Sequence, residues 1–230
     1  AYNTALGDSA LRLNTTASSN TAVGYQASYS NTTGTPNTAL GYQALYTNTT
    51  GSDNNAFGYA ALKLNTTGAA NCAFGHVSLD ANTTGGNNAG FGQATLSDNT
   101  TGQYNTALGS NALANNTTAS QNVAVGYQAG YSNTTAGNNV LIGYKSGYTG
   151  VTATQVTGLG SNTLVSNTGS YNTGLGYGAM YANTSGASNT AVGVEALVSN
   201  TTASYNTAVG YQAAYSNTTG GLNSSFGRGA

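Results

Sequence analysis

A short apolar segment that ends in glycine recurs along the whole chain. The clearest repeat is residues 206–222, NTAVGYQAAYSNTTGGL, in which the apolar segment precedes Gly210. Counting each unit from the position four residues before this glycine gives fourteen units, of which the last is truncated, and twelve of the thirteen complete units are 17 residues long. The chain is therefore predicted to be a single continuous array, residues 1–230, of one structural repeat. The glycine stands at residues 7, 24, 41, 58, 75, 92, 109, 126, 143, 160, 176, 193, 210 and 227.

Each unit is predicted to contain short strands. The segment TAVG fits a strand in which unit positions two and four share one face. Position four is large and apolar in every unit, so we assign it to the core. We expect a second strand over positions seven to ten and a third over the NTT of positions twelve to fourteen. Glycine at position five and the many Asn and Thr residues disfavour a helix.

These units predict an all-β fold, a parallel β-solenoid with one 17-residue rung per repeat and about fourteen rungs. The unit is too short for a helix pair or a propeller blade. Fourteen rungs at about 4.8 Å each would form a rod of roughly 67 Å. Equivalent residues would stack, giving tyrosine ladders at positions six and ten and asparagine ladders at positions one and twelve. An irregular rung is expected near 148–171, where Gly150 and Val156 replace Asn and one residue is missing.

Composition and charge exclude several functions. Only 4% of the residues are charged, with four Lys and Arg against five Asp and Glu, so no basic surface is available for nucleic acid or an anionic membrane. No apolar run approaches the roughly 20 residues that span a bilayer, so membrane insertion is not expected. A lone Cys72 excludes a disulfide framework and a thiolate metal site.

No residues suggest catalysis. His76 has no second His or Cys in register, and we interpret it as an exposed substitution in a tyrosine column. Cys72 is predicted to be a small buried hydrophobic residue. The five acidic residues lie in different units, and none forms a repeated pair that could hold calcium. We expect no enzyme, no cofactor and no metal.

The NTT element creates the acceptor pattern N-x-[S/T] in eleven units. One interpretation is a column of glycans, which would supply solubility at low charge. The other is a ladder of asparagines beside stacked threonines. Both interpretations stay open at this point. The asparagines are Asn14, Asn31, Asn48, Asn65, Asn82, Asn99, Asn116, Asn133, Asn183, Asn200 and Asn217.

Tyrosines mark candidate contact surfaces. Positions six and ten also accept charged residues in some units, which indicates that they are exposed. Tyrosine offers a flat apolar face and a hydroxyl, a combination suited to glycan or lateral protein contacts. At position six these residues are Tyr25, Tyr42, Tyr59, Tyr127, Tyr144, Tyr177 and Tyr211, and at position ten they are Tyr29, Tyr46, Tyr131, Tyr148, Tyr181 and Tyr215.

The segment 122–129, NVAVGYQA, resembles the head repeat of trimeric autotransporter adhesins, whose units carry a V-A-I-G-x-x-S core. Similar tandem units occur in phage tail-fibre-like and other extracellular repeat proteins. The resemblance implies a left-handed parallel β-roll with positions two and four inward and the glycine at a turn. It also implies a surface-exposed, usually trimeric adhesive fibre. The present unit is longer, usually has Ala at the small position and adds the NTTG extension.

The sequence thus favours a non-enzymatic structural protein, a rigid extracellular rod in a fibre, filament, adhesin or virion fibre. Self-association as a trimer or filament is expected, with a glycan or cell-surface ligand as a further candidate partner. The alternative is an ice-binding solenoid, since rows of Thr on a flat face can order water. That function needs two outward Thr rows spaced T-x-T, whereas the adjacent Thr residues of NTT would point to opposite faces of a strand.

Overall fold

The computed structural model describes residues 2–150 and 152–230. It contains two compact units, each built from several of the 17-residue repeats: the first unit is Ala1–Thr118 and the second unit is Ala119–Ala230. Each unit has seven short strands, and no described residue is helical. The strands of the first unit are β1 (Thr4–Leu6), β2 (Thr21–Val23), β3 (Asn37–Leu40), β4 (Asn54–Phe57), β5 (Cys72–Phe74), β6 (Ala89–Phe91) and β7 (Thr106–Leu108). Those of the second are β8 (Val123–Val125), β9 (Val140–Ile142), β10 (Thr157–Leu159), β11 (Thr173–Leu175), β12 (Thr190–Val192), β13 (Thr207–Val209) and β14 (Ser224–Phe226).

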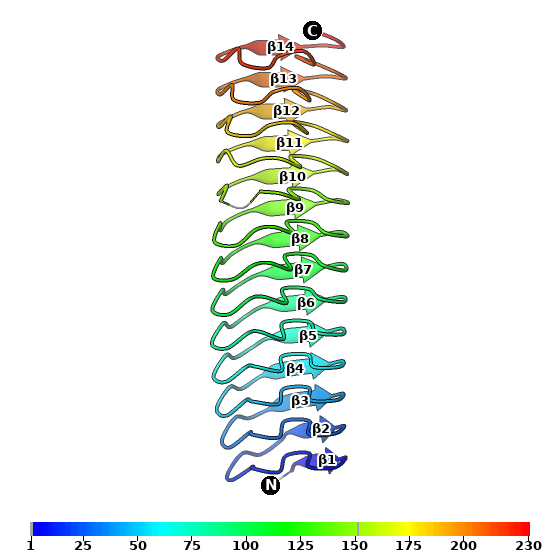
Figure 1. The fold of residues 1–230 in the computed structure, drawn as a ribbon, viewed down its shortest axis with the longest axis vertical. Coiled ribbons are helices and arrows are strands. Elements are labelled where there is room, and N and C mark those ends of the chain that lie inside the picture. The colour runs from blue at the N-terminus through cyan, green and yellow to red at the C-terminus, as the bar shows by residue number, and fades with distance from the viewer. Residues whose placement is uncertain (1, 151) are drawn as a thin grey trace. The chain divides into compact units, whose positions relative to one another are not determined.

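Within each unit, every strand pairs in parallel with the next strand along the chain (Figure 1). In the β2–β3 pair, Thr21 is opposite Thr38, an offset of one 17-residue repeat. Only the β10–β11 pair differs, because Thr157 is opposite Thr173, which matches the one short repeat. The predicted parallel β-solenoid, with one rung for each repeat, is confirmed.

The predicted second and third strands are wrong in the described rungs. Positions seven and nine have left-handed backbone, as at Gln43 (φ 51°) and Leu45 (φ 55°). Ala44 and Leu45 are adjacent in the chain, yet both are fully buried. A strand would turn two neighbouring side chains to opposite faces, so the left-handed residue is what lets both point inward. Rungs remain joined here, since the Leu45 backbone N–H donates to the Ala61 carbonyl at 2.9 Å.

The predicted inward direction of positions two and four is also wrong. In β2 the fully buried residue is Ala22 at position three, whereas Thr21 is exposed and Val23 is half-buried. The same alternation recurs in the other internal strands of both units. Position four therefore forms an outward column instead of the core, in contrast to what the adhesin resemblance implies. The interior is narrow, and small residues at position three leave room for the large residue at position nine.

The core consists mainly of leucines at position nine. Leu45, Leu62, Leu79, Leu96 and Leu113 are all completely buried in the first unit. In the second unit the same position holds Leu164, Met180 and Leu197, which are completely buried, but glycine at Gly130 and Gly147. Small residues, mostly alanine, at positions three and eight fill the space between these side chains, so the regular rungs contribute similar small amounts of apolar packing.

Glycine at position five forms the predicted corner. Gly58 has a φ of 139°, and a Cβ placed there would lie 2.3 Å from the carbonyl oxygen of Gly75 in the next rung. Both the backbone conformation and the close approach of the next rung therefore exclude any side chain.

The irregular region combines several departures from the repeat. It includes residue 151, which lies outside the described residues. Leu141 takes the place of the usual alanine at position three, and Gly147 takes the place of the usual leucine at position nine. A cavity of about 10 Å³, enough for about one water molecule, is lined by these two residues together with Gly150 and Val156. Gly150 and Val156 stand where regular repeats have asparagine, so apolar packing around Leu141 takes the place of the asparagine hydrogen bonds here.

Candidate functional surfaces

The acceptor asparagines at position twelve point into the interior of the rungs. All of them except Asn14 and Asn217 are buried. The Asn65 amide nitrogen Nδ2 donates to Asn48 Oδ1 and to the Gly68 carbonyl, both at 2.9 Å. The predicted asparagine ladder is therefore confirmed, because this pattern recurs from rung to rung in both units.

A second asparagine column, at position one, shares the same acceptor. Asn54 Nδ2 donates to the Gly68 carbonyl at 2.9 Å, so this oxygen receives two side-chain amides from its own rung. Asn54 Oδ1 accepts the backbone N–H of Asn71 at 3.1 Å. These neutral bonds satisfy polar groups that would otherwise be costly to bury.

Asn167 belongs to the position-twelve column although it is no glycosylation acceptor. Asn183 Nδ2 donates to Asn167 Oδ1 at 2.6 Å, and Asn167 Nδ2 donates to the Gly169 carbonyl at 2.8 Å. The acceptor pattern misses this residue because Gly169 stands where Ser or Thr would be required. Counting back from the position-five glycine of the next unit would have identified it.

The burial of the ladder favours packing over glycosylation as the reason for the NTT triplet. A glycan would be attached to the same Nδ2 atom that makes the two interior hydrogen bonds of Asn65. The first threonine of the triplet has a backbone role as well, since Thr66 Oγ1 donates to the Thr83 carbonyl at 3.0 Å. Only the second threonine, Thr67, is exposed. Within the triplet, the asparagine and the first threonine therefore make hydrogen bonds between rungs, and the second threonine faces solvent.

The tyrosines at position six form exposed stacks. The ring centroids of Tyr25, Tyr42, Tyr59 and His76 follow one another at 5.2, 5.1 and 5.0 Å. Tyr127 and Tyr144 stack in the same way in the second unit. Stacking covers the ring faces and leaves edges and hydroxyls toward solvent. A sugar ring therefore cannot lie on the faces inside the stack, although hydroxyl contacts remain available.

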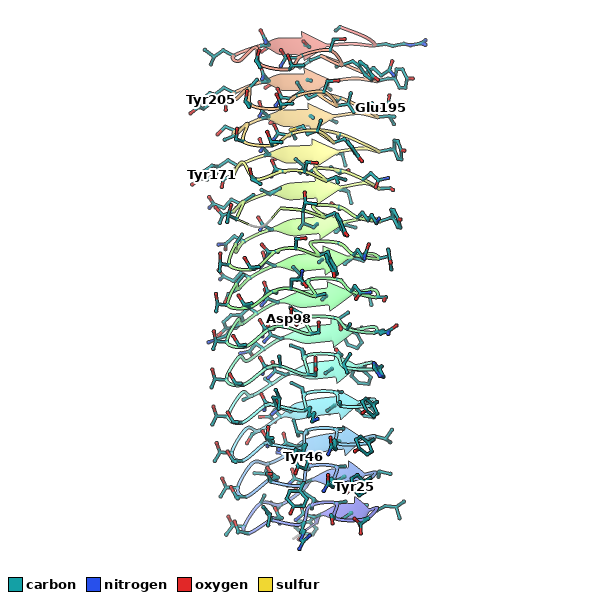
Figure 2. The ribbon with its side chains drawn as sticks, in the orientation of Figure 1. Tyr25, Tyr46, Asp98, Tyr171, Glu195 and Tyr205 are labelled. Carbon is teal, nitrogen blue, oxygen red and sulfur yellow. The ribbon has the colours of Figure 1, made fainter. Side chains whose placement is uncertain are left out.

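Four of the tyrosines at position ten lie lower on the surface, whereas Tyr181 and Tyr215 are exposed. Tyr29 and Tyr46 are half-buried and stacked at 5.3 Å, and Tyr131 and Tyr148 stack at 5.4 Å. Cations lie near this column, because Lys145 Nζ is 5.0 Å from the Tyr148 ring centroid. Figure 2 shows that the tyrosines at position seventeen of the second unit, Tyr171 and Tyr205, project from the side opposite Glu195. Tyrosines thus lie on more than one side of the rungs.

The outward side of strands β1–β7 carries a third column, which we call the strand face. It consists of the side chains at positions two and four of the first unit. At position four, Phe57, Phe74 and Phe91 stack with centroid separations of 4.5 and 5.1 Å. The strand face was missed in the sequence, although the constantly small residue at position three was a signal that this position, and not position four, faces the interior. The exposed large residues of the face are Leu6 (66%), Leu40 (47%), Phe91 (39%) and Leu108 (48%).

Titratable and metal-ligating groups do not assemble into a site in the described part of the chain. No three His, Cys, Asp or Glu side chains there lie close enough to hold a metal ion. Burial raises the pKa of the half-buried Asp80 carboxyl above its usual value, and the nearby Asp98 adds to the rise.

Cys72, predicted to be buried, instead lies half-buried on the strand face as a free thiol. Among the residues that the structure describes, no helix is long and apolar enough to cross a membrane.

Comparison with models of protein families, with curated proteins and with solved structures finds no match. The resemblance to adhesin and tail-fibre repeats therefore stays a prediction from the repeat itself.

Proposed function

We propose that this protein is a non-enzymatic structural component, a rigid rod within an extracellular fibre, filament or adhesin that associates with copies of itself. The observation that carries the proposal is the repetition of the surface. The tyrosine stacks, the strand face and the asparagine ladders all recur with the rungs. Catalysis needs one unique constellation, whereas repeated rungs supply length and a repeated contact surface.

The interior supports a stiff scaffold. Gly68 accepts amides from Asn54 and Asn65, and Asn65 in turn is bonded to Asn48 in the preceding rung. The regular rungs repeat these contacts, so each of them contributes a similar stabilising interface to its neighbour. This arrangement needs neither charges nor disulfides, in agreement with a chain that has 4% charged residues and one cysteine.

A glycan or cell-surface ligand is the second partner that we propose. The exposed edges of the Tyr25, Tyr42 and Tyr59 stack present hydroxyls in a regular row. Such a row suits hydrogen bonding to a repetitive polar ligand, since tyrosine combines an apolar body with a polar tip.

Ice binding has weaker support than the structural role. Thr67 and its equivalents at position fourteen form one exposed row in the first unit. The adjacent row at position thirteen is not available, because Thr66 and its equivalents donate their hydroxyls to backbone carbonyls. On the strand face, Thr at position two is interrupted by Asn55, Cys72 and Ala89. A regular lattice of two Thr rows is therefore missing.

Small-angle X-ray scattering of the full chain tests the structural role. The proposal predicts elongated particles whose mass increases with concentration. Compact particles with equal dimensions in all directions would contradict it. Thermal hysteresis, measured on the same sample, would instead favour the ice-binding alternative.

A further inference from the structure

We propose that a second copy of this chain docks on the strand face of the first unit. The inference rests on the proposed structural function and assigns the surface through which self-association takes place. It differs from the tyrosine-mediated contact that the sequence suggests, because the strand face is the more apolar of the two surfaces.

The strand face exposes a substantial apolar area. At about 180 Å² for each large side chain, the four exposed position-four residues present roughly 350 Å² of apolar surface. The half-buried position-four residues and the position-two side chains extend the face toward the about 800 Å² that one partner contributes to a stable interface. A patch of this size is comparable to the largest apolar patch of a typical monomer, and such patches are often contact sites. The four residues are Leu6, Leu40, Phe91 and Leu108.

The strand face carries no charged side chain, which disfavours strongly charged partners. Positions two and four carry no charged residue in any of the fourteen repeats, whereas all nine charges of the chain lie at other positions. A nucleic acid or a strongly acidic or basic protein would find no complementary charge on this face. Two copies of the face meet without electrostatic repulsion, which is the condition that self-docking requires.

The spacing of the rows favours a second copy over an unrelated protein. Paired strands are separated by about 4.8 Å, so the side chains of the strand face form parallel rows at this spacing, one row for each rung. Phe57 and Phe74 show this spacing directly, with ring centroids 4.5 Å apart. A partner keeps its contacts over seven rungs only if its own side chains repeat at the same distance. A second copy meets this condition through its own repeat.

The tyrosine column is a poorer docking surface. Tyr25, Tyr42 and Tyr59 already cover one another's ring faces, so they offer edges and hydroxyls that water hydrates well. The strand face offers aliphatic groups and the edges of stacked phenyl rings, which carry no hydroxyl, and their removal from water is favourable at about 25 cal/mol per Å².

Cys72 provides a native probe of the proposed contact. It is the first residue of β5 and stands at position two of its repeat, within the strand face, as a free, half-buried thiol. A docked second copy would cover this sulfur, so its alkylation would slow when the protein assembles. The tyrosine column lies on a different part of the rung and gives no such protection.

The experiment compares three full-length proteins by sedimentation velocity over a range of concentrations. They are the wild type, a strand-face variant (Leu6→Lys, Leu40→Lys and Leu108→Lys) and a matched tyrosine variant (Tyr25→Ser, Tyr42→Ser and Tyr59→Ser). The lysines replace outward side chains in non-adjacent rungs, and circular dichroism checks that the fold is retained. In parallel, the rate of Cys72 alkylation by iodoacetamide is measured at low and high wild-type concentration.

The inference predicts that the wild type and the tyrosine variant assemble, while the strand-face variant sediments as a 22.8 kDa monomer. Self-association of that variant should weaken about tenfold or more, and Cys72 alkylation in the assembled wild type should slow about tenfold. Assembly of the strand-face variant at wild-type strength, or unchanged Cys72 alkylation, overturns the inference but leaves the structural function standing. Loss of assembly only in the tyrosine variant moves the interface to that column. A monomeric wild type overturns both the inference and the proposed self-association.

Should the lysine variant fail to fold, the wild-type alkylation decides alone. Slower alkylation on assembly supports docking on the strand face, and an unchanged rate overturns it.

Discussion

Regular rungs have a small residue at position three and a large one at position nine. The irregular rung has the reverse, with Leu141 at position three and Gly147 at position nine. A regular rung has Ala39 and Leu45 there, and both are fully buried. In the irregular rung the large side chain comes from position three instead, and a Cβ on Gly147 would lie 2.7 Å from Leu141 Cδ2. We therefore expect the two positions to be strongly coupled in their effect on stability.

The single substitutions should both be costly. Leu141→Ala removes a buried side chain beside an existing cavity and should cost about 2–5 kcal/mol. Gly147→Leu alone collides with Leu141, which should cost about 1–3 kcal/mol through overpacking. It also places a side chain on left-handed backbone (φ 62°), which adds about 1–2 kcal/mol.

The double variant should recover most of this loss. Leu141→Ala with Gly147→Leu recreates the arrangement of Ala39 and Leu45, a leucine on left-handed backbone packed over an alanine. Only the backbone cost of about 1–2 kcal/mol should remain. The sum of the two single costs should exceed the cost of the double variant by at least about 3 kcal/mol.

Urea denaturation followed by circular dichroism measures these costs, provided that the variants share one m-value. Leu197→Ala, in a regular rung of the second unit, serves as the control. It should lose a similar free energy of unfolding as Leu141→Ala, and Gly147→Leu should not rescue it. Strictly additive costs for Leu141→Ala and Gly147→Leu would refute the proposed exchange of volume.

Four further outcomes are expected. Gly58→Ala should lower the free energy of unfolding by at least about 3 kcal/mol, because the new Cβ meets the Gly75 carbonyl on positive-φ backbone, and an unchanged urea midpoint would contradict this. Asn65→Asp should cost about 2–5 kcal/mol at neutral pH, since a carboxylate replaces two donated hydrogen bonds, and less at acidic pH, where the carboxyl can donate. Asp80→Asn should raise the free energy of unfolding at neutral pH and leave it unchanged below about pH 4. The reason is that folding raises the pKa of the Asp80 carboxyl, so the charged form that dominates at higher pH destabilises the folded state. Equal urea midpoints of the two proteins across this pH range would speak against the assigned burial. Treatment with an N-glycosidase should leave the mass at 22.8 kDa, and a drop toward this value would show that ladder asparagines carry glycans.

The repeat and its hydrogen-bonding residues could be predicted from the sequence. A strict 17-residue period leaves few architectures, and parallel stacking follows because each residue meets its equivalent in the next rung. Asn48 and Asn65 form their ladder for that reason. The exposure of Tyr25 and Tyr42 followed from the charged residues that other units accept at the same position.

The direction of the side chains could not be predicted with the same rule. In a strand of three residues, Thr21 and Val23 point one way and Ala22 the other, and the alternation alone does not say which face is inward. The choice depends on the turn that follows, where Ala44 and Leu45 both point inward. That turn relies on leucine in left-handed backbone, a conformation that leucine rarely adopts and that its presence in a sequence does not signal. The strand face was missed for this reason.

The mass of the wild-type chain in solution, measured by light scattering over a wide concentration range, tests the proposed self-associating fibre most directly. We predict masses that are multiples of 22.8 kDa and that increase with concentration. A mass of 22.8 kDa at every concentration would contradict the account.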